Sequence, residues 1–227
     1  MRVLLLGLIL LLLGGCAHDG RLAPSQLVKT DIDRVAEAHR REAFASLRLL
    51  AEKLYRRNPA EWRRGGQPSM EAAMAQLFDP QQAWRLPPLA GKRGVDAILA
   101  ALHPDYRGDR VMALVGGMGG MLHAAFNEKT EFFLLDDLDP QVLHNSARNL
   151  EIAAWKLTNA RDAAGYLLLL SNEMQAQHNL SFEREFGKLI GNLDLLSRLV
   201  ADKANRTVVK VIQSMATAVF LPVPGLK

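Results

Sequence analysis

Side chains of similar polarity recur every three or four positions over long stretches of this chain, and that spacing limits the folds it can adopt. The first long stretch runs from Gln26 to Arg57, and its inward-facing positions are Ile32, Val35, His39, Ala43, Leu47, Leu50 and Leu54. The opposite face carries Asp33, Glu37, Arg40, Arg41, Arg48 and Glu52. A period near 3.6 is typical of an amphipathic helix, so the sequence predicts one long helix over residues 26–57.

Helix start signals then divide the next part of the chain into short segments. Asn58-Pro59-Ala60-Glu61 combines a capping residue, a proline at the first helical position and a glutamate at the third. A second short helix is expected to present Met70, Ala73, Met74, Leu77 and Phe78 as one apolar face. Asp79-Pro80 is expected to begin another, and a further stripe consists of Val95, Ile98, Leu99 and Leu102.

The C-terminal part predicts three more helices. Asp139-Pro140 begins one whose buried residues are Leu143, Ala147, Leu150, Ala154 and Leu157. The very apolar segment from Ala163 to about Ala176 is expected to be a helix at the buried centre of the bundle. The last helix is expected to run from about Ser181 to Phe220, with an apolar stripe formed by Phe186, Leu189, Ile190, Leu193, Leu196, Val200, Val208, Val211, Met215 and Val219.

The middle of the chain, residues 111–151, supports two interpretations. In the first, Val111 to Val115 is a strand, Gly116 to Gly120 a glycine loop, and Phe132 to Leu135 a second strand ending in Asp136-Asp137. This layout suits a nucleotide or a methyl donor, because glycines let the backbone approach a ligand and the acid accepts hydrogen bonds from a ribose. It resembles the opening of a class I methyltransferase. Against it, Leu122 stands where a third glycine belongs, and no further strands follow to complete a sheet.

In the second interpretation, Asp109 caps a helix from Arg110 to about Asn127. Four glycines in five residues cost such a helix about 1 kcal/mol each relative to alanine. The small residues Gly116, Gly120 and Ala124 would offset this cost by allowing close helix packing. The neighbour could belong to the same chain, to a second copy or to lipid, and a break in the helix is equally allowed.

Composition excludes several classes of protein. Aromatic residues make up 6% of the chain and Leu, Ala and Met are plentiful, which favours helices. The formal charge of +4 suits an anionic membrane surface or cell-wall polymer but is too diffuse to indicate nucleic-acid binding. Cys16 is the only cysteine, so the sequence excludes intrachain disulfides and thiolate metal sites.

The N-terminal residues Met1 to Cys16 have the layout of an export signal. Arg2 precedes an apolar run from Val3 to Leu13, which is too short to span a bilayer. Leu13-Gly14-Gly15-Cys16 resembles a bacterial lipobox. The resemblance implies cleavage after Gly15, diacylglycerol on the Cys16 sulfur, and acylation, typically with palmitate, of the new amino terminus. An ordinary secretory signal with an incidental Cys16 is the alternative.

The same resemblance implies a location. Ala17 is not the aspartate that resembles an inner-membrane retention signal, so the implied site is the outer membrane, with the domain facing the periplasm. The expected organisation is a signal peptide over 1–15, a lipidated tether over 16–25 and a helical domain over 26–227. The chain as a whole resembles a proteobacterial lipoprotein, and the lipobox is its one specific motif.

No catalytic constellation stands out in the sequence. The six histidines fit no ligand spacing, and His39 on an apolar face is expected to be a hydrogen-bonded core residue. Asp136, Asp137 and Asp139 with His144 could attract a hard cation, but helix capping by Asp139 is the plainer account. A basic and aromatic patch could bind lipid headgroups or a cell-wall anion, although arginines favoured at helix ends are the plainer account; its members are Tyr55, Arg56, Arg57, Trp62, Arg63 and Arg64.

The sequence therefore predicts an all-α, single-domain bundle of about eight helices with a long C-terminal helix. The expected function is a structural or protein-interaction role in the cell envelope, without catalysis, cofactor or metal. The expected partners are membrane lipid, through the anchor on Cys16, and an envelope protein or a second copy, but not nucleic acid. A lipid-handling protein is the alternative, and a Rossmann-like cofactor enzyme ranks below it.

Overall fold

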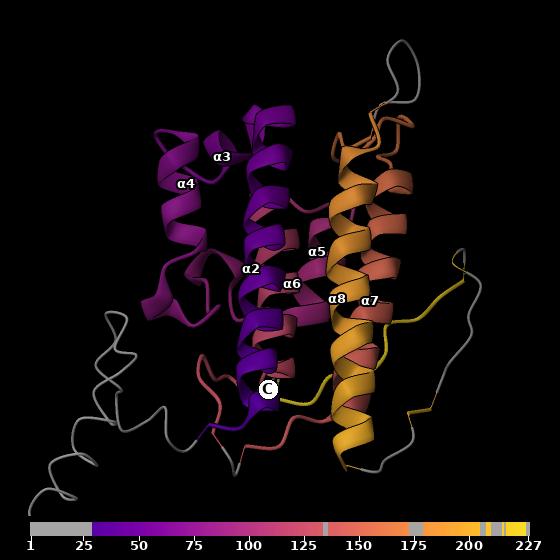
Figure 1. Ribbon diagram of the computed structural model, residues 1–227. Helices are drawn as coiled ribbons and strands as arrows, with labels where there is room; N and C mark the ends of the chain where they lie inside the picture. Colours follow the sequence, from indigo (N-terminus) through magenta and orange to yellow (C-terminus); the bar gives the residue numbers. More distant parts are fainter. Residues whose placement is uncertain are drawn as a thin grey trace, which may run out of the picture.

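Four long helices form an antiparallel bundle around one hydrophobic core (Figure 1). The computed structural model describes residues 29–133, 136–172, 179–204, 208–209, 215 and 217–225. The four helices are α2 (Asp31–Arg57), α6 (Arg110–Ala125), α7 (Pro140–Asn159) and α8 (Ser181–Ala204). Each packs against the next around a closed ring, α2 with α6, α6 with α7, α7 with α8, and α8 with α2. The predicted all-α single domain is confirmed.

Three shorter helices lie outside this ring. They are α3 (Pro59–Arg64), α4 (Met70–Leu77) and α5 (Gly94–Ala101), and two 3₁₀ turns, η2 (Pro80–Gln82) and η3 (Pro87–Leu89), join α4 to α5. Helix α5 packs on α6, while α3 and α4 lie beside α2 (Figure 1). Within the described ranges, no helix has both the length and the apolar character needed to cross a membrane.

Side-chain caps fix where most of these helices begin, and those of α6 and α7 are the predicted ones. Helix α2 begins at Asp31 rather than at the predicted Gln26, since Thr30 caps it and Lys29 is not helical. Thr30 and Asp33 form a reciprocal capping box at the start of α2, and Asp109 and Asp139 accept hydrogen bonds from the first turns of α6 and α7. Asn58 differs, because it precedes Pro59 without a side-chain cap bond. Its side-chain amide instead donates to the backbone carbonyl of Leu54, in the last turn of α2.

Helix α6 is the buried centre of the bundle. All sixteen of its residues are buried, and its neighbours are α2, α5 and α7, with smaller contacts to α3 and α4. The interpretation of Val111 to Val115 as a strand before a glycine loop is wrong, since these residues and the glycines after them form this one helix. Complete burial of its apolar side chains against these neighbours offsets the poor helix propensity of the glycines.

The predicted buried helix at 163–176 is wrong over the residues that the structure describes. Residues 160–172 form a loop in which Arg161 and Leu167 make an antiparallel bridge. The Asp162 carboxylate accepts the amides of Ala164 and Tyr166, and Gly165 takes a left-handed φ of 86°. These local bonds compete with helix formation, and Tyr166 is 73% exposed.

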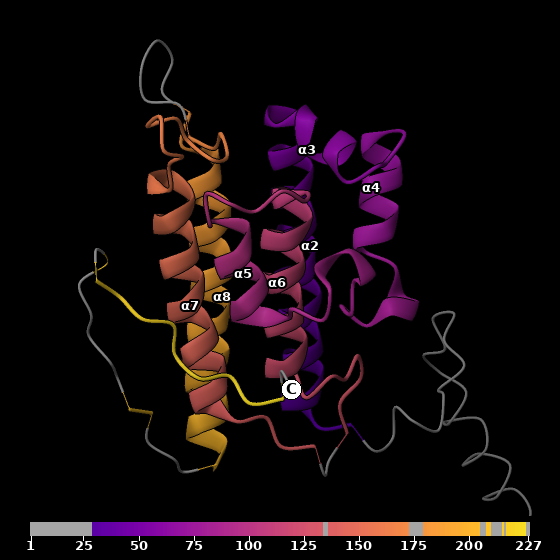
Figure 2. The ribbon, with the colours of Figure 1, turned by 180° about the vertical axis from the view of Figure 1, so that it is seen from behind.

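The last helix is shorter than its apolar stripe predicts. Helix α8 ends at Ala204, and the described residues from Val208 to Gly225 are not helical. Val208 and Val209 are β-branched and so favour extended backbone. We call residues 217–225 the C-terminal segment; it crosses α7 on the face shown in Figure 2. Val223 from this segment is buried in the core.

Candidate functional site

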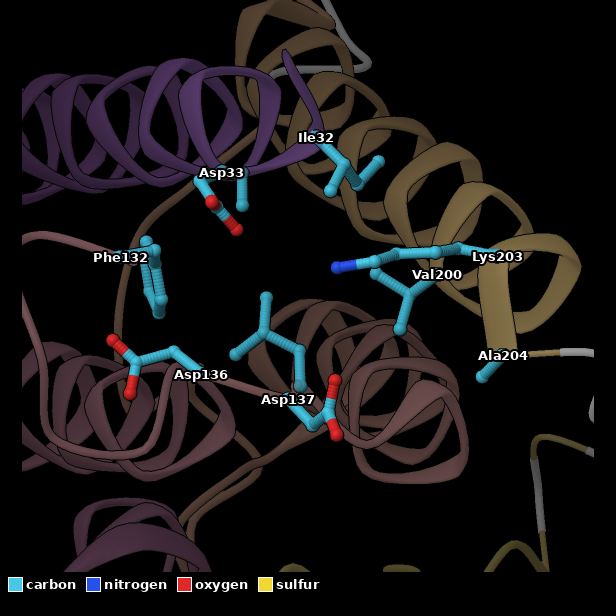
Figure 3. Close-up of a pocket in the computed structure, with 10 residues that line it drawn as sticks. Ile32, Asp33, Phe132, Asp136, Asp137, Val200, Lys203 and Ala204 are labelled. Carbon is cyan, nitrogen blue, oxygen red and sulfur yellow. The ribbon is translucent and has the colours of Figure 1, made fainter. Parts of the chain in front are cut away.

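A cavity of about 230 Å³ opens at the end of the bundle where α2 begins and α8 ends (Figure 3). Its apolar wall includes Phe132, Leu138 and Val200, and its polar residues are Asp33, Asp136, Asp137 and Lys203. The Lys203 amino group points into the space between α2 and Phe132 (Figure 3). Pockets for drug-sized ligands usually measure about 300–1,000 Å³, so this cavity fits a small molecule or one end of a longer amphiphile.

Two of the carboxylates at this cavity already have partners. Asp33 accepts both the backbone amide and the hydroxyl of Thr30, each at 2.7 Å. Asp136 pairs with Lys129 and accepts the Phe133 amide at 3.0 Å. The hydrogen bond from Lys129 lowers the pKa of Asp136 from its ordinary value. These contacts stabilise the start of α2 and the loop after α6, which leaves Lys203 and Asp137 to contact a ligand.

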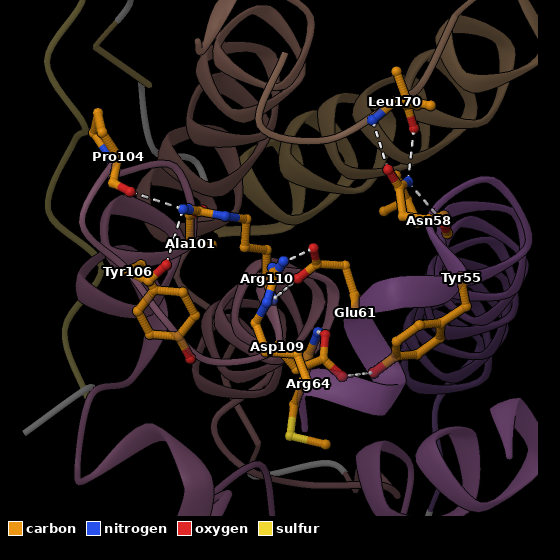
Figure 4. A network of polar contacts seen from close by, with 12 residues as sticks. Tyr55, Asn58, Glu61, Arg64, Ala101, Pro104, Tyr106, Asp109, Arg110 and Leu170 are labelled. Atoms are coloured by element: carbon orange, nitrogen blue, oxygen red, sulfur yellow. Dashed lines mark hydrogen bonds and ion pairs between the residues drawn. The ribbon is translucent and has the colours of Figure 1, made fainter. Parts of the chain in front are cut away.

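A buried polar network joins the ends of α2 and α3 to the start of α6 (Figure 4). The Asp109 Oδ2 atom accepts the Tyr55 hydroxyl at 2.8 Å, while its Oδ1 accepts the Met112 amide at 2.9 Å. Glu61 contributes a second cap, because its Oε2 accepts the Arg110 backbone amide at 2.8 Å. Its Oε1 accepts Arg64 Nη1 at 2.5 Å.

The Arg110 guanidinium organises the turn before α6. It donates to four backbone carbonyls, those of Ala101, His103, Pro104 and Tyr106, at 2.6, 2.8, 3.1 and 2.9 Å (Figure 4). A second cavity of about 330 Å³ lies on the outer side of Glu61, Arg64 and Arg110. The charged groups of these three residues are already bonded to protein atoms.

Burial shifts the acid–base behaviour of this network. It raises the pKa of the Asp109 carboxyl to about 6, although hydrogen bonds from Met112 and Tyr55 act in the opposite direction. It also raises the pKa of the Tyr55 hydroxyl far above its ordinary value, and the nearby Asp109 charge adds to this effect. Shifted pKa values often mark functional sites, but here both Asp109 oxygens are occupied in holding helices together.

A third site lies on α7, where three amide side chains contact the backbone of the chain after α8. Asn149 makes two bonds with Leu221, donating to its carbonyl at 2.8 Å and accepting its amide at 2.6 Å. Asn145 donates to the Pro222 carbonyl at 2.9 Å. Gln141 pairs in the same two-bond way with Val209, at 3.1 and 2.8 Å. We call Gln141, Asn145 and Asn149 the amide row.

The glycines of α6 make close contacts with the same chain. A Cβ atom at Gly117 would lie 2.6 Å from the Gly94 carbonyl oxygen of α5, whereas one at Gly120 would lie 3.6 Å from the Gly94 nitrogen. The space beside Gly119 holds the Trp84 indole, and a Cβ at Gly116 would lie 2.5 Å from Leu86.

Trp84 and Ala124 complete the surroundings of these glycines. Trp84 has a left-handed φ of 62° and stacks on Phe44. Ala124 packs beside Gly225 of the C-terminal segment. The space left by the four glycines is thus largely filled by side chains and by α5.

The candidate cation ligands have separate partners and do not converge on one point. Asp139 caps α7, Asp136 pairs with Lys129, and His144 Nδ1 lies 3.7 Å from Asp194 Oδ1 on α8. Nowhere in the described ranges do three metal-binding side chains gather closely enough to share an ion. His39 is hydrogen-bonded as expected, with its Nδ1 3.2 Å from the Asn192 carbonyl oxygen, but it is half-buried rather than part of the core.

The predicted basic and aromatic patch is not one continuous surface. Tyr55 is completely buried. Arg56 pairs with Glu52, Arg63 lies over the Trp62 ring, and Arg64 pairs with Glu61. Cys16, with the lipobox and the whole predicted tether over 16–25, lies outside the described residues.

Sequence reasoning missed the amide row and the small cavity. The only sequence signal for the row is three amide residues spaced by four on one helix. No sequence signal marks the cavity, because segments distant along the chain form its wall. Compared with protein-family models, curated proteins and solved structures, the chain matches none.

Proposed function

We propose that the protein is a non-catalytic lipoprotein of the bacterial envelope whose helical bundle binds a protein partner. The observation that carries this proposal is the use of the buried ionisable groups. Asp109, Glu61 and Arg110 are engaged in joining α2, α3 and α5 to the start of α6, so they support a rigid scaffold rather than chemistry. The lipobox at Cys16 supports the anchor.

The position of the anchor limits where a partner can be reached. Thr30, the cap of α2, follows Cys16 by fourteen positions, and an extended chain of that length spans at most about 50 Å. A chain lipidated at Cys16 would therefore keep the start of α2 within that distance of the bilayer. The partner would be an envelope protein that approaches the same membrane surface.

The anchor is tested by comparing the chain with its Cys16→Ala variant in cells. An affinity tag inserted in the exposed turn at Ala163–Ala164 avoids both ends of the chain. We expect the unaltered protein in the membrane fraction with the mass of three acyl chains, and the variant in the soluble fraction without them. Equal recovery of both from the soluble fraction would contradict the anchor.

The partner is tested by mild crosslinking, gentle solubilisation and mass spectrometry of the tagged protein. We expect one envelope protein in near-equal amount, recovered less with Cys16→Ala because the bundle is then no longer held at the membrane. Recovery of the anchored protein without any stoichiometric protein would contradict an interaction role.

The cavity at the end of the bundle favours a second candidate function, the binding of a small amphiphile. Val200 and Phe132 offer an apolar wall, and Lys203 offers a positive charge. Gentle isolation followed by lipid extraction should then yield a bound amphiphile from the unaltered protein. The variant Ala36→Trp, which fills the cavity, should yield less, and Ala60→Trp on the exposed side of α3 is the matched control.

A further inference from the structure

We infer that Asn145 and Asn149 of the amide row form a binding site for an extended peptide, and that the C-terminal segment occupies it in place of a partner's segment. The partner sequence that fits has an apolar residue, a proline and a second apolar residue, in the order of Leu221, Pro222 and Val223. This inference rests on the proposed function, since it names the surface and the chemistry by which the partner binds.

The first argument is that the amide row contacts main-chain atoms. Five hydrogen bonds join it to the chain after α8 among the described residues, and each uses a backbone amide or carbonyl. Asn149 and Gln141 each bond both the amide and the carbonyl of one residue. A carboxamide that pairs in this way imitates the neighbouring strand of a sheet. Such bonds recognise an extended backbone whatever its side chains are.

The second argument is the register of the C-terminal segment. Pro222 has no amide hydrogen, and at this position the site uses only the carbonyl, which accepts from Asn145. Val223, 8% exposed, provides the apolar anchor. The site therefore selects an apolar anchor at the position of Val223 and tolerates a proline before it, since Pro222 is exposed and uses only its carbonyl.

The third argument is the cost of an empty row. Asn149 is completely buried and Asn145 is 7% exposed. Buried amides without partners are unfavourable, so any segment that covers these side chains must offer main-chain groups to them, as the C-terminal segment does. A tethered segment has an effective concentration in the millimolar range. A free peptide must therefore compete with it, and weakening the tethered segment should strengthen peptide binding at least tenfold.

The experiment measures binding of a fluorescent peptide with the sequence of residues 217–225 to the full chain. Val223→Asp in the protein weakens its own segment but leaves α7 unaltered, so we expect the peptide to bind this variant at least tenfold more tightly than the unaltered chain. Adding Asn149→Ala should reverse the gain. Adding Asn159→Ala should not, because Asn159 is on the same helix but bonds only within it.

A chemically altered peptide tests recognition of the backbone directly. N-methylation at the position of Leu221 removes the amide that Asn149 accepts and should weaken binding at least tenfold, while the same change at the exposed Thr217 should have little effect. Equal binding of both peptides, or no binding to a folded Val223→Asp chain, overturns the inference. Circular dichroism establishes that each variant is folded.

If Val223→Asp does not fold, hydrogen exchange on the unaltered chain replaces it. Excess peptide should then accelerate exchange of the tethered Leu221 amide, and unchanged exchange at saturating peptide overturns the inference. The crosslinking experiment separates the two proposals. If the Asn149→Ala variant recovers the partner as well as the unaltered chain does, the proposed function is supported and the amide row is overturned as the binding site.

Discussion

The Tyr55 hydroxyl, near the C-terminal end of α2, lies 2.8 Å from Oδ2 of Asp109, the residue that caps α6. This bond joins two helices through residues that are 54 positions apart in sequence and satisfies a carboxylate that is 4% exposed. Because an unsatisfied buried acceptor costs about 1–3 kcal/mol, Tyr55→Phe should lower the free energy of unfolding by that amount. Urea denaturation measures the loss, and Tyr166→Phe, at a 73% exposed position, should show none.

The raised pKa of Asp109 predicts a specific pH dependence. Burial raises it from 3.8 to about 6, so between these values the folded state binds more protons than the unfolded state. The contribution of Asp109 to stability is therefore greatest below pH 4 and falls as the pH rises to about 6. Asp109→Asn keeps the cap but does not titrate. The difference in unfolding free energy between the two proteins should change by at most about 3 kcal/mol over this range, and parallel pH profiles would contradict the assignment.

Two glycines on α6 should respond in opposite ways to alanine. A Cβ at Gly117 would meet backbone atoms of Gly94 and Ile98 at 2.6 and 2.9 Å. Since backbone cannot move aside easily, Gly117→Ala should destabilise the fold by about 1–3 kcal/mol. At Gly120 the nearest atoms are 3.6 and 3.7 Å away, so Gly120→Ala should stabilise it by up to about 1 kcal/mol. Thermal unfolding of both variants checks this, and a shift in the same direction would refute it.

Asn58 should determine how well the loop at 160–172 is held. Its side chain bonds both the amide and the carbonyl of Leu170, at 2.7 and 2.9 Å. Asn58→Ala removes both bonds, so trypsin should cleave after Arg161 several times faster than in the unaltered chain. Gln67→Ala, which removes an unrelated surface bond to Gln76, is the control. Unchanged cleavage would mean that Asp162 and Gly165 hold the loop without Asn58.

Local capping chemistry could be predicted from the sequence because both partners of each contact are close in the chain. Asp109 and Asp139 begin α6 and α7 as predicted. The buried faces of α2, α7 and the first part of α8 also follow from their spacing, as Leu47, Leu150 and Leu193 illustrate. The prediction from hydrophobicity was wrong where local side-chain bonds and a glycine favour a turn. The run Leu167 to Leu170 suggested a core helix, but Asp162 and Gly165 bend the chain into a loop.

The candidate sites depended on contacts that sequence spacing does not reveal. Gln141 meets Val209 from 68 positions away, and Asn149 meets Leu221 from 72. In the sequence alone, amides spaced by four on a helix indicate a solvated face, whereas Asn149 is completely buried. The helical interpretation of the glycine segment was correct, yet nothing in the sequence indicated that Trp84 and Leu86 fill the space beside Gly119 and Gly116.

The place of α2 in the ring determines how the molecule bears mechanical load. Helix α2 lies between α6 and α8, and a force that pulls on its first residue against the far end of the bundle would act along its axis. Ala43, Leu47, Leu50 and Leu54 are all completely buried along that helix. To pull α2 out, a force must slide these side chains past their neighbours together, in shear, rather than peel them away one by one. A bundle attached at this end should therefore resist stretching far better than one attached through its C-terminal segment.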